Sequence, residues 1–237
     1  MPSLSISFPA YNEEANIGKA IEDAVRVASQ LAADFEVIVV NDGSADRTSE
    51  VVREYMARYP QVRLIEHEVN QGYGAAVFDG LVGGVKEWAF FTDGDLQFVL
   101  DELAELWALR QEADLIIGYR APRRDPFIRK LNGWGWTWLT NVLFGYVSRD
   151  VDCAFKLLSR QVIDTVGPRV ASRGATFSAE FLARAKQMGF AFREVPVTHL
   201  PRTAGSQTGA KLSVILRAFW EMFLFRIKMW REKAHSS

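Results

Sequence analysis

Apolar segments with two different spacings alternate along the first half of this 237-residue chain. Five short apolar segments predict β-strands, and they cover residues 4–8, 35–40, 62–65, 88–92 and 115–118. Between them, apolar residues recur three and four positions apart, as at Ile17, Ala20, Ile21 and Ala24, which predicts helices. Strands that alternate with helices in this way indicate an α/β fold with a mostly parallel central sheet flanked by helices.

Polar and acidic loops follow three of the predicted strands. Residues 9–14 follow the first strand, 41–44 the second and 92–97 the fourth. The carboxyl ends of parallel strands meet at one edge of the sheet, and ligands bind at that edge in open α/β folds. We therefore expect the functional site there.

Two carboxylates, Asp93 and Asp95, stand one residue apart where the fourth strand ends, and the amide of Gln97 follows. Hard divalent cations prefer such oxygen ligands. An acidic turn can also serve loop geometry alone, so the motif needs its context. We place Asp95 on a solvent-facing loop rather than in the core.

The acidic residue after the second strand, Asp42, stands where a dinucleotide-binding fold holds a ribose hydroxyl. The first turn lacks G-x-G-x-x-G, however, and Pro9, Tyr11 and Glu13 would crowd a pyrophosphate there, which disfavours a dehydrogenase. Glycines in 72–74 suit either a tight turn or a close approach to a nucleotide.

The charge of the chain changes sign after residue 118. Residues 1–118 carry 8 Lys and Arg against 21 Asp and Glu, whereas 119–237 carry 20 against 8. The basic half also contains Trp134 and Trp138, which share one helical face and suit either the core or a membrane interface. A basic, aromatic half would suit phosphates or an anionic membrane surface.

The second half predicts further elements, a strand over 151–158, a helix over 177–188 and a strand over 191–197. The predicted terminal helix, from Lys211 to about Trp230, carries too many charges to span a bilayer, so it packs on the domain or lies in the membrane interface. We divide the chain into a domain at 1–210 and an amphipathic helix at 211–237. A single cysteine excludes an internal disulfide framework, and the N-terminus lacks a signal-peptide pattern, which predicts a cytoplasmic location.

An ordered set of short motifs runs through the chain: F-P-A-Y-N-E-E, N-D-G-S-A-D-R-T, G-Y-G-A-A, D-G-D-L-Q, G-Y-R, R-K-L-N-G, D-V-D-C-A-F-K-L and P-R-T-A-G-S. In this combination the chain, from about Ser5 to Ser206, resembles the dolichol-phosphate mannose and glucose synthases, or polyprenyl-phosphate glycosyltransferases, of glycosyltransferase family two. The resemblance implies a GT-A fold and inverting transfer of a hexose from a nucleotide diphosphate sugar, of GDP-mannose or UDP-glucose type, to a polyprenyl or dolichyl phosphate. It also implies a peripheral location on the cytoplasmic face of a membrane, with no nucleic-acid partner. An integral-membrane partner and a homo-oligomer stay open.

The resemblance also implies residue roles. The positions matched to nucleotide-sugar binding are Pro9, Tyr11, Glu13, Asp42, Gly72, Gly74, Asp93, Gly94, Asp95, Arg120 and Arg202. Those matched to Mg²⁺ or Mn²⁺ are Asp93, Asp95 and Gln97; those matched to the acceptor phosphate are Arg120, Arg129 and Gly133; and the catalytic set is Asp95, Arg129, Asp152 and Arg202. Gly94 and Ala154 stand where relatives often have Ala and Gly. Some relatives have Ser at the position of Gly133, which puts one acceptor-phosphate contact in doubt.

The residue types fit this chemistry without the resemblance. A leaving nucleotide diphosphate needs its charge offset by a divalent ion and cationic side chains. A lipid monophosphate is already ionised and needs no strong base, whereas a hydroxyl acceptor would, and Asp152 is then the best candidate. The alternatives are therefore a glycosyltransferase acting on a hydroxyl, or a non-catalytic nucleotide-binding subunit at a membrane, which retention of Asp93 and Asp95 disfavours. The absence of Q-x-x-R-W argues against a processive polysaccharide synthase.

Overall fold

The structure is a computed structural model that describes residues 2–124, 127–202 and 212–235, without the side chains of 128–129, 212–219 and 232–235. Its described strands form one sheet in the order β3-β2-β1-β4-β6-β5-β7. Their bounds are β1 Leu4–Ala10, β2 Phe35–Asn41, β3 Val62–Glu66, β4 Trp88–Thr92, β5 Leu115–Arg120, β6 Phe155–Ser159 and β7 Phe192–Val197. All five strands predicted in the first half of the chain are present.

Most neighbouring strands are parallel, which confirms the predicted sheet. β1 pairs in parallel with β2 and β4, so that Leu4 is opposite both Phe35 and Trp88. β6 is the exception, because it runs antiparallel between β4 and β5. The loops after β1, β2 and β4 therefore meet at one edge of the sheet, as predicted.

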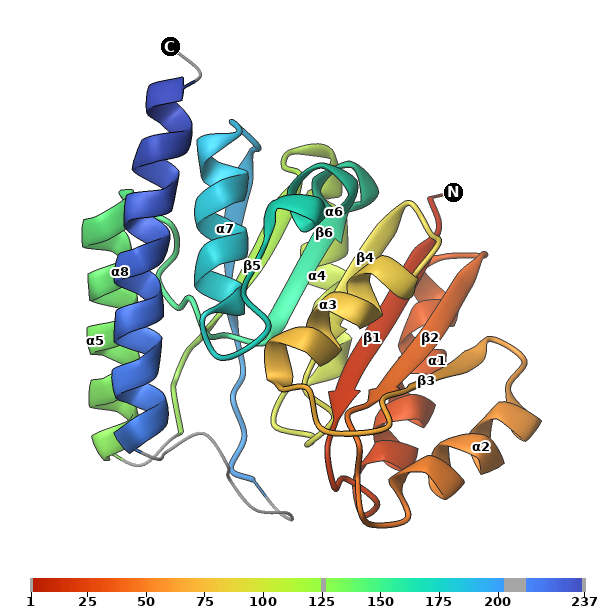
Figure 1. Cartoon of the computed structure of the whole chain (residues 1–237). Helices are drawn as coiled ribbons and strands as arrows, with labels where there is room; N and C mark the ends of the chain where they lie inside the picture. Colours follow the sequence, from red (N-terminus) through yellow and green to blue (C-terminus); the bar gives the residue numbers. More distant parts are fainter. Residues whose placement is uncertain (1, 125–126, 203–211, 236–237) are drawn as a thin grey trace.

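Helices cover both faces of the sheet (Figure 1). One face carries α1 (Ile17–Leu31), α2 (Thr48–Arg58) and α4 (Leu103–Ala108), and the other carries α3 (Tyr73–Gly83), α6 (Arg160–Val166) and α7 (Phe177–Gln187). Short 3₁₀ turns at Leu100–Glu102 and Leu109–Gln111 flank α4, where one helix was predicted, and a third lies at Gly167–Arg169. Side by side next to α7 lie α5 (Phe127–Phe144) and α8 (Leu212–His235).

The strands separate two apolar clusters because successive side chains point to opposite faces of the sheet. In β4, Phe90 packs into the cluster beneath α1 and α4, whereas Ala89 and Phe91 pack with α3 and α7. In β1, Leu4 and Ile6 belong to the first cluster. Burial on both faces holds β1 and β4, and with them the site edge, rigidly in the centre of the sheet.

The predicted strand over 151–158 is wrong in its first half. β6 begins at Phe155, and residues 151–154 form a turn instead. The reason is the buried side chain of Lys156, whose Nζ donates to the carbonyl of Val151 at 3.1 Å and to the carbonyl of Cys153. Carbonyls bound in this way fold the chain back instead of extending the strand.

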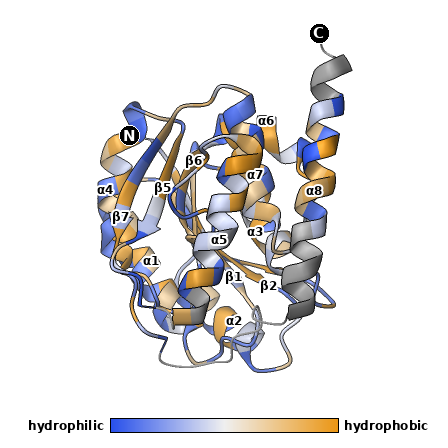
Figure 2. Cartoon of the chain, turned by 90° about the vertical axis from the view of Figure 1, so that its left-hand side faces the viewer, coloured by the Kyte–Doolittle hydropathy of each residue, from blue (hydrophilic) through white to orange (hydrophobic). Residues whose placement is uncertain are grey.

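α8 packs on the domain with one face. Met222, Phe225 and Met229 join the apolar cluster of α5 and α7, and Glu221 accepts a hydrogen bond from the Thr176 hydroxyl at 3.1 Å. Other hydrophobic side chains of α8, at Trp220, Phe223, Leu224 and Trp230, are exposed, so its coloured part alternates between hydrophobic and hydrophilic residues (Figure 2). None of the described helices has both the length and the apolarity needed to cross a membrane. The division of the chain at residue 210 stays a prediction.

Candidate active site

The acidic pair predicted at the end of β4 contains an unsatisfied oxygen. Oδ1 of Asp93 is buried and has no hydrogen-bond partner among the described residues. Burial and the neighbouring Asp95 raise the pKa of Asp93 to about 7. Buried oxygens usually have partners, so this site fits a divalent cation that would supply the missing charge. The described residues contain no group of three or more His, Cys, Asp or Glu side chains that could hold a metal ion.

Asp95 is buried, so its prediction on a solvent-facing loop is wrong. The segment after β7 covers it: Arg202 Nη1 lies 3.6 Å from Asp95 Oδ2. Gln97 holds this segment, since its Nε2 donates to the Leu200 carbonyl at 3.0 Å and its own carbonyl accepts from Leu200 N at 2.7 Å. The assignment of Gln97 as a metal ligand stays a prediction.

Glu13 joins the same group of charges. Its Oε1 pairs with Arg202 Nη2, and its Oε2 accepts from Asn16 Nδ2 at 2.8 Å. Burial raises the pKa of Glu13, although Asn16 and Arg202 favour its charged form. The structure thus brings together Glu13, Asp95 and Arg202, which lie far apart in the sequence. The loop predicted over 203–209 lies outside the described residues.

Asp42 organises the loop that follows β3. Its Oδ1 accepts from Gln71 N at 2.8 Å and its Oδ2 from Gly72 N at 2.9 Å. His67 lies between two carboxylates, with Nδ1 2.7 Å from Asp42 Oδ1 and Nε2 2.9 Å from Asp79 Oδ2. Sequence reasoning missed His67, because nothing in its local pattern marks these partners. A nucleotide contact by Asp42 stays a prediction.

Gly72 and Gly74 have structural reasons to be glycine. Gly72 has φ +102°, and a Cβ on Gly74 would lie 2.6 Å from Phe177 Cβ. The loop before α7 packs against this turn, where Ala75 N donates to the Arg173 carbonyl at 2.8 Å. Close packing of two chain segments therefore accounts for the G-Y-G sequence, and nucleotide binding here stays a prediction.

The other residues matched to the nucleotide sugar lie at the same edge. Pro9 is in β1 and Tyr11 follows it, half exposed. Gly94 lies between the two acidic residues, and a Cβ there would come within 3.2 Å of Ile17 Cδ1. Their ligand contacts stay predictions.

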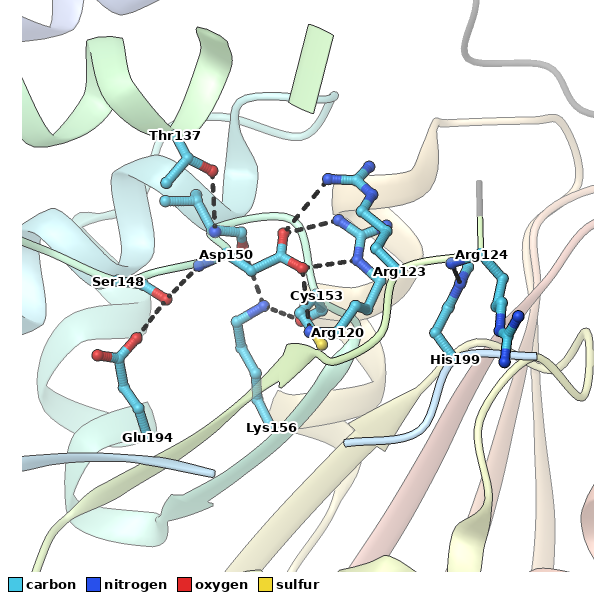
Figure 3. A network of polar contacts seen from close by, with 11 residues as sticks. Arg120, Arg123, Arg124, Thr137, Ser148, Asp150, Cys153, Lys156, Glu194 and His199 are labelled. Atoms are coloured by element: carbon cyan, nitrogen blue, oxygen red, sulfur yellow. Dashed lines mark hydrogen bonds and ion pairs between the residues drawn. The ribbon is translucent and has the colours of Figure 1, made fainter. Parts of the chain in front are cut away.

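A network of polar contacts that includes Arg120 and Arg123 lies at the end of β5 (Figure 3). Arg120 donates from Nε to Asp150 Oδ2 at 2.6 Å and from Nη2 to Asp150 Oδ1 at 2.7 Å. Arg123 Nη1 lies 4.0 Å from Asp150 Oδ1. Although burial opposes it, Arg120 holds the pKa of Asp150 below its ordinary value. Sequence reasoning chose Asp152 and missed Asp150, the other acid of D-V-D.

Asp152 is exposed on the turn that Lys156 holds. Dense surrounding protein raises the pKa of Asp152, and the charge of Arg120 opposes that shift. Burial lowers the pKa of Lys156. Lys156, another residue that sequence reasoning missed, therefore positions Asp152 through the backbone of the turn.

The residues matched to the acceptor phosphate fall on two elements. Arg120 ends β5, whereas Arg129 and Gly133 lie on α5. The Arg129 side chain is outside the described residues. The Arg123 guanidinium lies against Gly133 and so connects the two elements.

A family model described as glycosyl transferase family 2 matches residues 5–167. The chain belongs to glycosyl transferase family 2. This confirms the family that the motifs indicated.

Three curated relatives illustrate what this family 2 chain is similar to. A dolichyl-phosphate beta-glucosyltransferase of Trichomonas vaginalis is 32% identical over 80% of this chain and 61% of the relative. Its counterpart in Dictyostelium discoideum is 24% identical over 82% of this chain and 65% of the relative. The dodecaprenyl-phosphate galacturonate synthase of Rhizobium johnstonii is 30% identical over 69% of this chain and 49% of the relative. The family 2 chain therefore spans from about half to about two thirds of the length of these relatives.

A solved structure shows the same fold. Glucosyl-3-phosphoglycerate synthase from Mycobacterium tuberculosis, in complex with Mn²⁺, uridine diphosphate and glucosyl-3-phosphoglycerate, superimposes with a TM-score of 0.72 at 19% identity. The match covers 95% of this chain and 80% of the synthase. The predicted GT-A α/β fold is confirmed.

Proposed function

We propose that this family 2 protein transfers a hexose, with inversion, from a nucleotide diphosphate sugar to a polyprenyl phosphate. We base this on the buried Oδ1 of Asp93, which has no hydrogen-bond partner within the described part of the chain. It lies beside Asp95, at a sheet edge that also carries Arg120 and Arg123. Acidic and basic groups are close there, since the charge of Arg120 acts on Asp93. The names of the curated relatives support a lipid phosphate as acceptor.

Asp93 and Asp95 would hold Mg²⁺ or Mn²⁺. The bound ion would offset the negative charge that develops on the leaving diphosphate. Crystals of the M. tuberculosis synthase that contain Mn²⁺ or Mg²⁺ with uridine diphosphate support this assignment.

Arg202 binds the donor in this proposal. It now pairs with Glu13 and lies near Asp95, so a diphosphate entering this edge would compete with two carboxylates for its guanidinium. Arginine suits this exchange because its planar fork binds carboxylate and phosphate alike. Before the donor binds, Glu13 and Asp95 hold the Arg202 guanidinium in place.

The acceptor phosphate would lie near the basic network at the end of β5. Such a nucleophile is ionised at neutral pH and needs orientation rather than a base. One observation favours the alternative of a hydroxyl acceptor: Asp152 is exposed and its pKa is raised, as a general base requires.

A membrane surface would deliver the lipid. Exposed side chains on α5 form one stripe, Phe127, Leu131, Trp134, Trp138 and Val142, at spacings of three and four residues. Exposure of Trp134 and Trp138 is contrary to the alternative that both belong to the core, although Trp136 between them is buried. α8 exposes a similar set, Trp220, Phe223, Leu224 and Trp230.

Basic residues accompany these apolar stripes. Arg226, Lys228 and Arg231 of α8 are exposed, and Arg226 and Lys186 line a groove of about 740 Å³ between α5, α7 and α8. Tryptophan and basic residues together suit a bilayer interface with anionic lipids. We infer peripheral binding at a cytoplasmic membrane face.

The test is to incubate the protein and Mn²⁺ with radiolabelled nucleotide sugars and polyprenyl phosphate, and to measure label that enters the organic phase. Lipid-soluble label, lost in Asp93→Asn, is the expected result. Asp101→Asn removes an exposed carboxylate of α4's flanking turn and serves as the matched control. Label in a soluble acceptor alone would overturn the lipid-phosphate assignment.

A further inference from the structure

His67, which directly follows β3, is buried between two carboxylates. Its Nδ1 lies 2.7 Å from Asp42 Oδ1, and its Nε2 lies 2.9 Å from Asp79 Oδ2. Asp42 follows β2 and is buried as well, whereas Asp79 is half-exposed on α3. One imidazole ring therefore connects the segment after β2, the segment after β3 and the helix α3.

The two ring nitrogens of His67 face groups that accept hydrogen bonds when they are ionised. A neutral imidazole donates from one nitrogen and presents a lone pair on the other, whereas an imidazolium donates from both. With one proton on the ring, a carboxylate oxygen of either Asp42 or Asp79 faces a lone pair. The number of protons on His67 therefore decides whether both contacts are attractive.

Other charged groups near His67 in the chain have different surroundings. Glu66 accepts from Ser49 Oγ at 2.6 Å and pairs with Arg53 of α2, and Glu68 is exposed. Within the described part of the chain, the charged groups in contact with the His67 ring are thus the carboxylates after β2 and on α3.

Asp42 holds the loop over 68–72 at its far end. Its two carboxylate oxygens accept from the last two backbone amides of this loop, at 2.8 and 2.9 Å. The middle of the loop packs against Gly43, where a Cβ would lie 2.6 Å from Asn70 N. The loop begins after His67 and ends where α3 begins, so the contact between His67 and Asp42 fixes both of its ends.

The contact with His67 also orients the carboxylate of Asp42. Oδ1 faces His67 and one loop amide, and Oδ2 accepts from the other loop amide. A carboxylate offers about four lone-pair positions, so, counted over the described residues, one on Oδ2 is left for an N–H or O–H group of a nucleoside. His67 therefore fixes which oxygen of Asp42 a ligand would meet.

We propose that His67 positions Asp42 and the loop over 68–72 for the nucleotide sugar, and that it does so fully when its ring carries two protons. The inference rests on the proposed function and on Asp42 as a nucleotide ligand. His67 is a positioning residue, because it acts through Asp42. Histidine loses its second proton between about pH 5 and 8, so donor binding should weaken as pH rises through that range.

The first test measures the KM for UDP-glucose and for GDP-mannose, at saturating Mn²⁺ and polyprenyl phosphate. His67→Gln keeps a side chain of similar size but cannot donate to both carboxylates from the same positions. At pH 6 we expect its donor KM to rise about tenfold, with kcat and the acceptor KM nearly unchanged. Thermal unfolding checks that the variant is folded.

Asp79→Asn tests the requirement for two protons. An amide at this position can donate to Nε2, so a ring with one proton, on Nδ1, then satisfies both partners. The ratio of the wild-type donor KM to that of Asp79→Asn should rise about threefold to tenfold between pH 6 and 8. This ratio cancels the titration of Asp93, which both proteins retain. Asp101→Asn, which removes an exposed carboxylate outside the site, is the matched control and should keep the wild-type pH dependence.

The outcomes separate this inference from the proposed function. An unchanged donor KM in His67→Gln, with an active wild type, overturns the positioning role alone, and so does a loss confined to kcat, which a merely structural role would produce. Equal pH dependence in the wild type and Asp79→Asn overturns the requirement for two protons. A wild type that transfers from neither nucleotide sugar overturns the proposed function together with this inference.

Discussion

Arg202 forms an ion pair with Glu13, a residue 189 positions earlier in the chain, and the same guanidinium lies 3.6 Å from Asp95 Oδ2. The pair joins the segment after β7 to the loop after β1, across the end of the sheet. Both carboxylates are buried, so the arginine offsets charge that would otherwise destabilise the fold.

Arg202→Gln should lower the free energy of unfolding by about 1–3 kcal/mol, because it leaves two buried carboxylates without their cation. Mn²⁺ should restore part of this loss by neutralising Asp95. Urea unfolding with and without Mn²⁺ measures both effects. The control is Arg26→Gln, which breaks an exposed pair with Asp101 and should cost less than about 1 kcal/mol. Equal losses in the two variants would contradict the special position of Arg202.

Metal affinity should depend on pH through Asp93. Burial and the charge of Asp95 raise the pKa of Asp93 to about 7. The ion binds the ionised carboxylate, so Mn²⁺ affinity should fall about tenfold for each pH unit below 7 and level off above it. Calorimetric titration at several pH values measures this.

The stability of the metal-free protein should change with pH in the opposite direction to metal affinity. A carboxyl group whose folded-state pKa lies above its unfolded value binds its proton more tightly in the folded state. Stability should therefore fall as pH rises from about 4 to about 7. Asp93→Asn should flatten this part of the pH profile; a profile like that of the wild type would assign the effect to another group.

The sequence predicted the features that depend on local pattern. Strand spacing placed Asp42 and Asp93 at one sheet edge, because parallel strands align their ends. It could not predict the burial of Asp95, which depends on hydrogen bonds between Gln97 and Leu200, about a hundred residues later. The turn over 151–154 was missed for a similar reason, since an apolar run looks like a strand until Lys156 binds its carbonyls.

The packing of Gly74 also depends on residues about a hundred positions later in the chain, so the sequence alone could not predict it. Gly74→Ala should destabilise by about 1–3 kcal/mol, because its Cβ would meet the backbone carbonyl of Gly174 at 2.5 Å and Phe177 Cβ at 2.6 Å. Urea midpoints measure the change. Gly174→Ala, across the same contact, meets nothing within 4 Å and should stay within about 0.5 kcal/mol of the wild type. If Gly74→Ala leaves the urea midpoint unchanged, close packing does not explain the glycine, and nucleotide binding becomes the better explanation.

The exposed stripes of α5 and α8 should bind membranes. Trp138→Glu combined with Trp220→Glu should weaken binding to vesicles of phosphatidylcholine and phosphatidylglycerol at least about tenfold, because it removes two interfacial rings and adds like charge facing anionic lipid. Both tryptophans are exposed, so thermal stability should not change. The control, Val69→Glu with Val85→Glu, adds the same charges at exposed positions outside these helices. Cosedimentation compares the two pairs. Only the tryptophan pair alters the surface that is proposed to enter the interface. If the valine pair weakens vesicle binding as much as the tryptophan pair does, net charge explains the effect and the aromatic stripes do not.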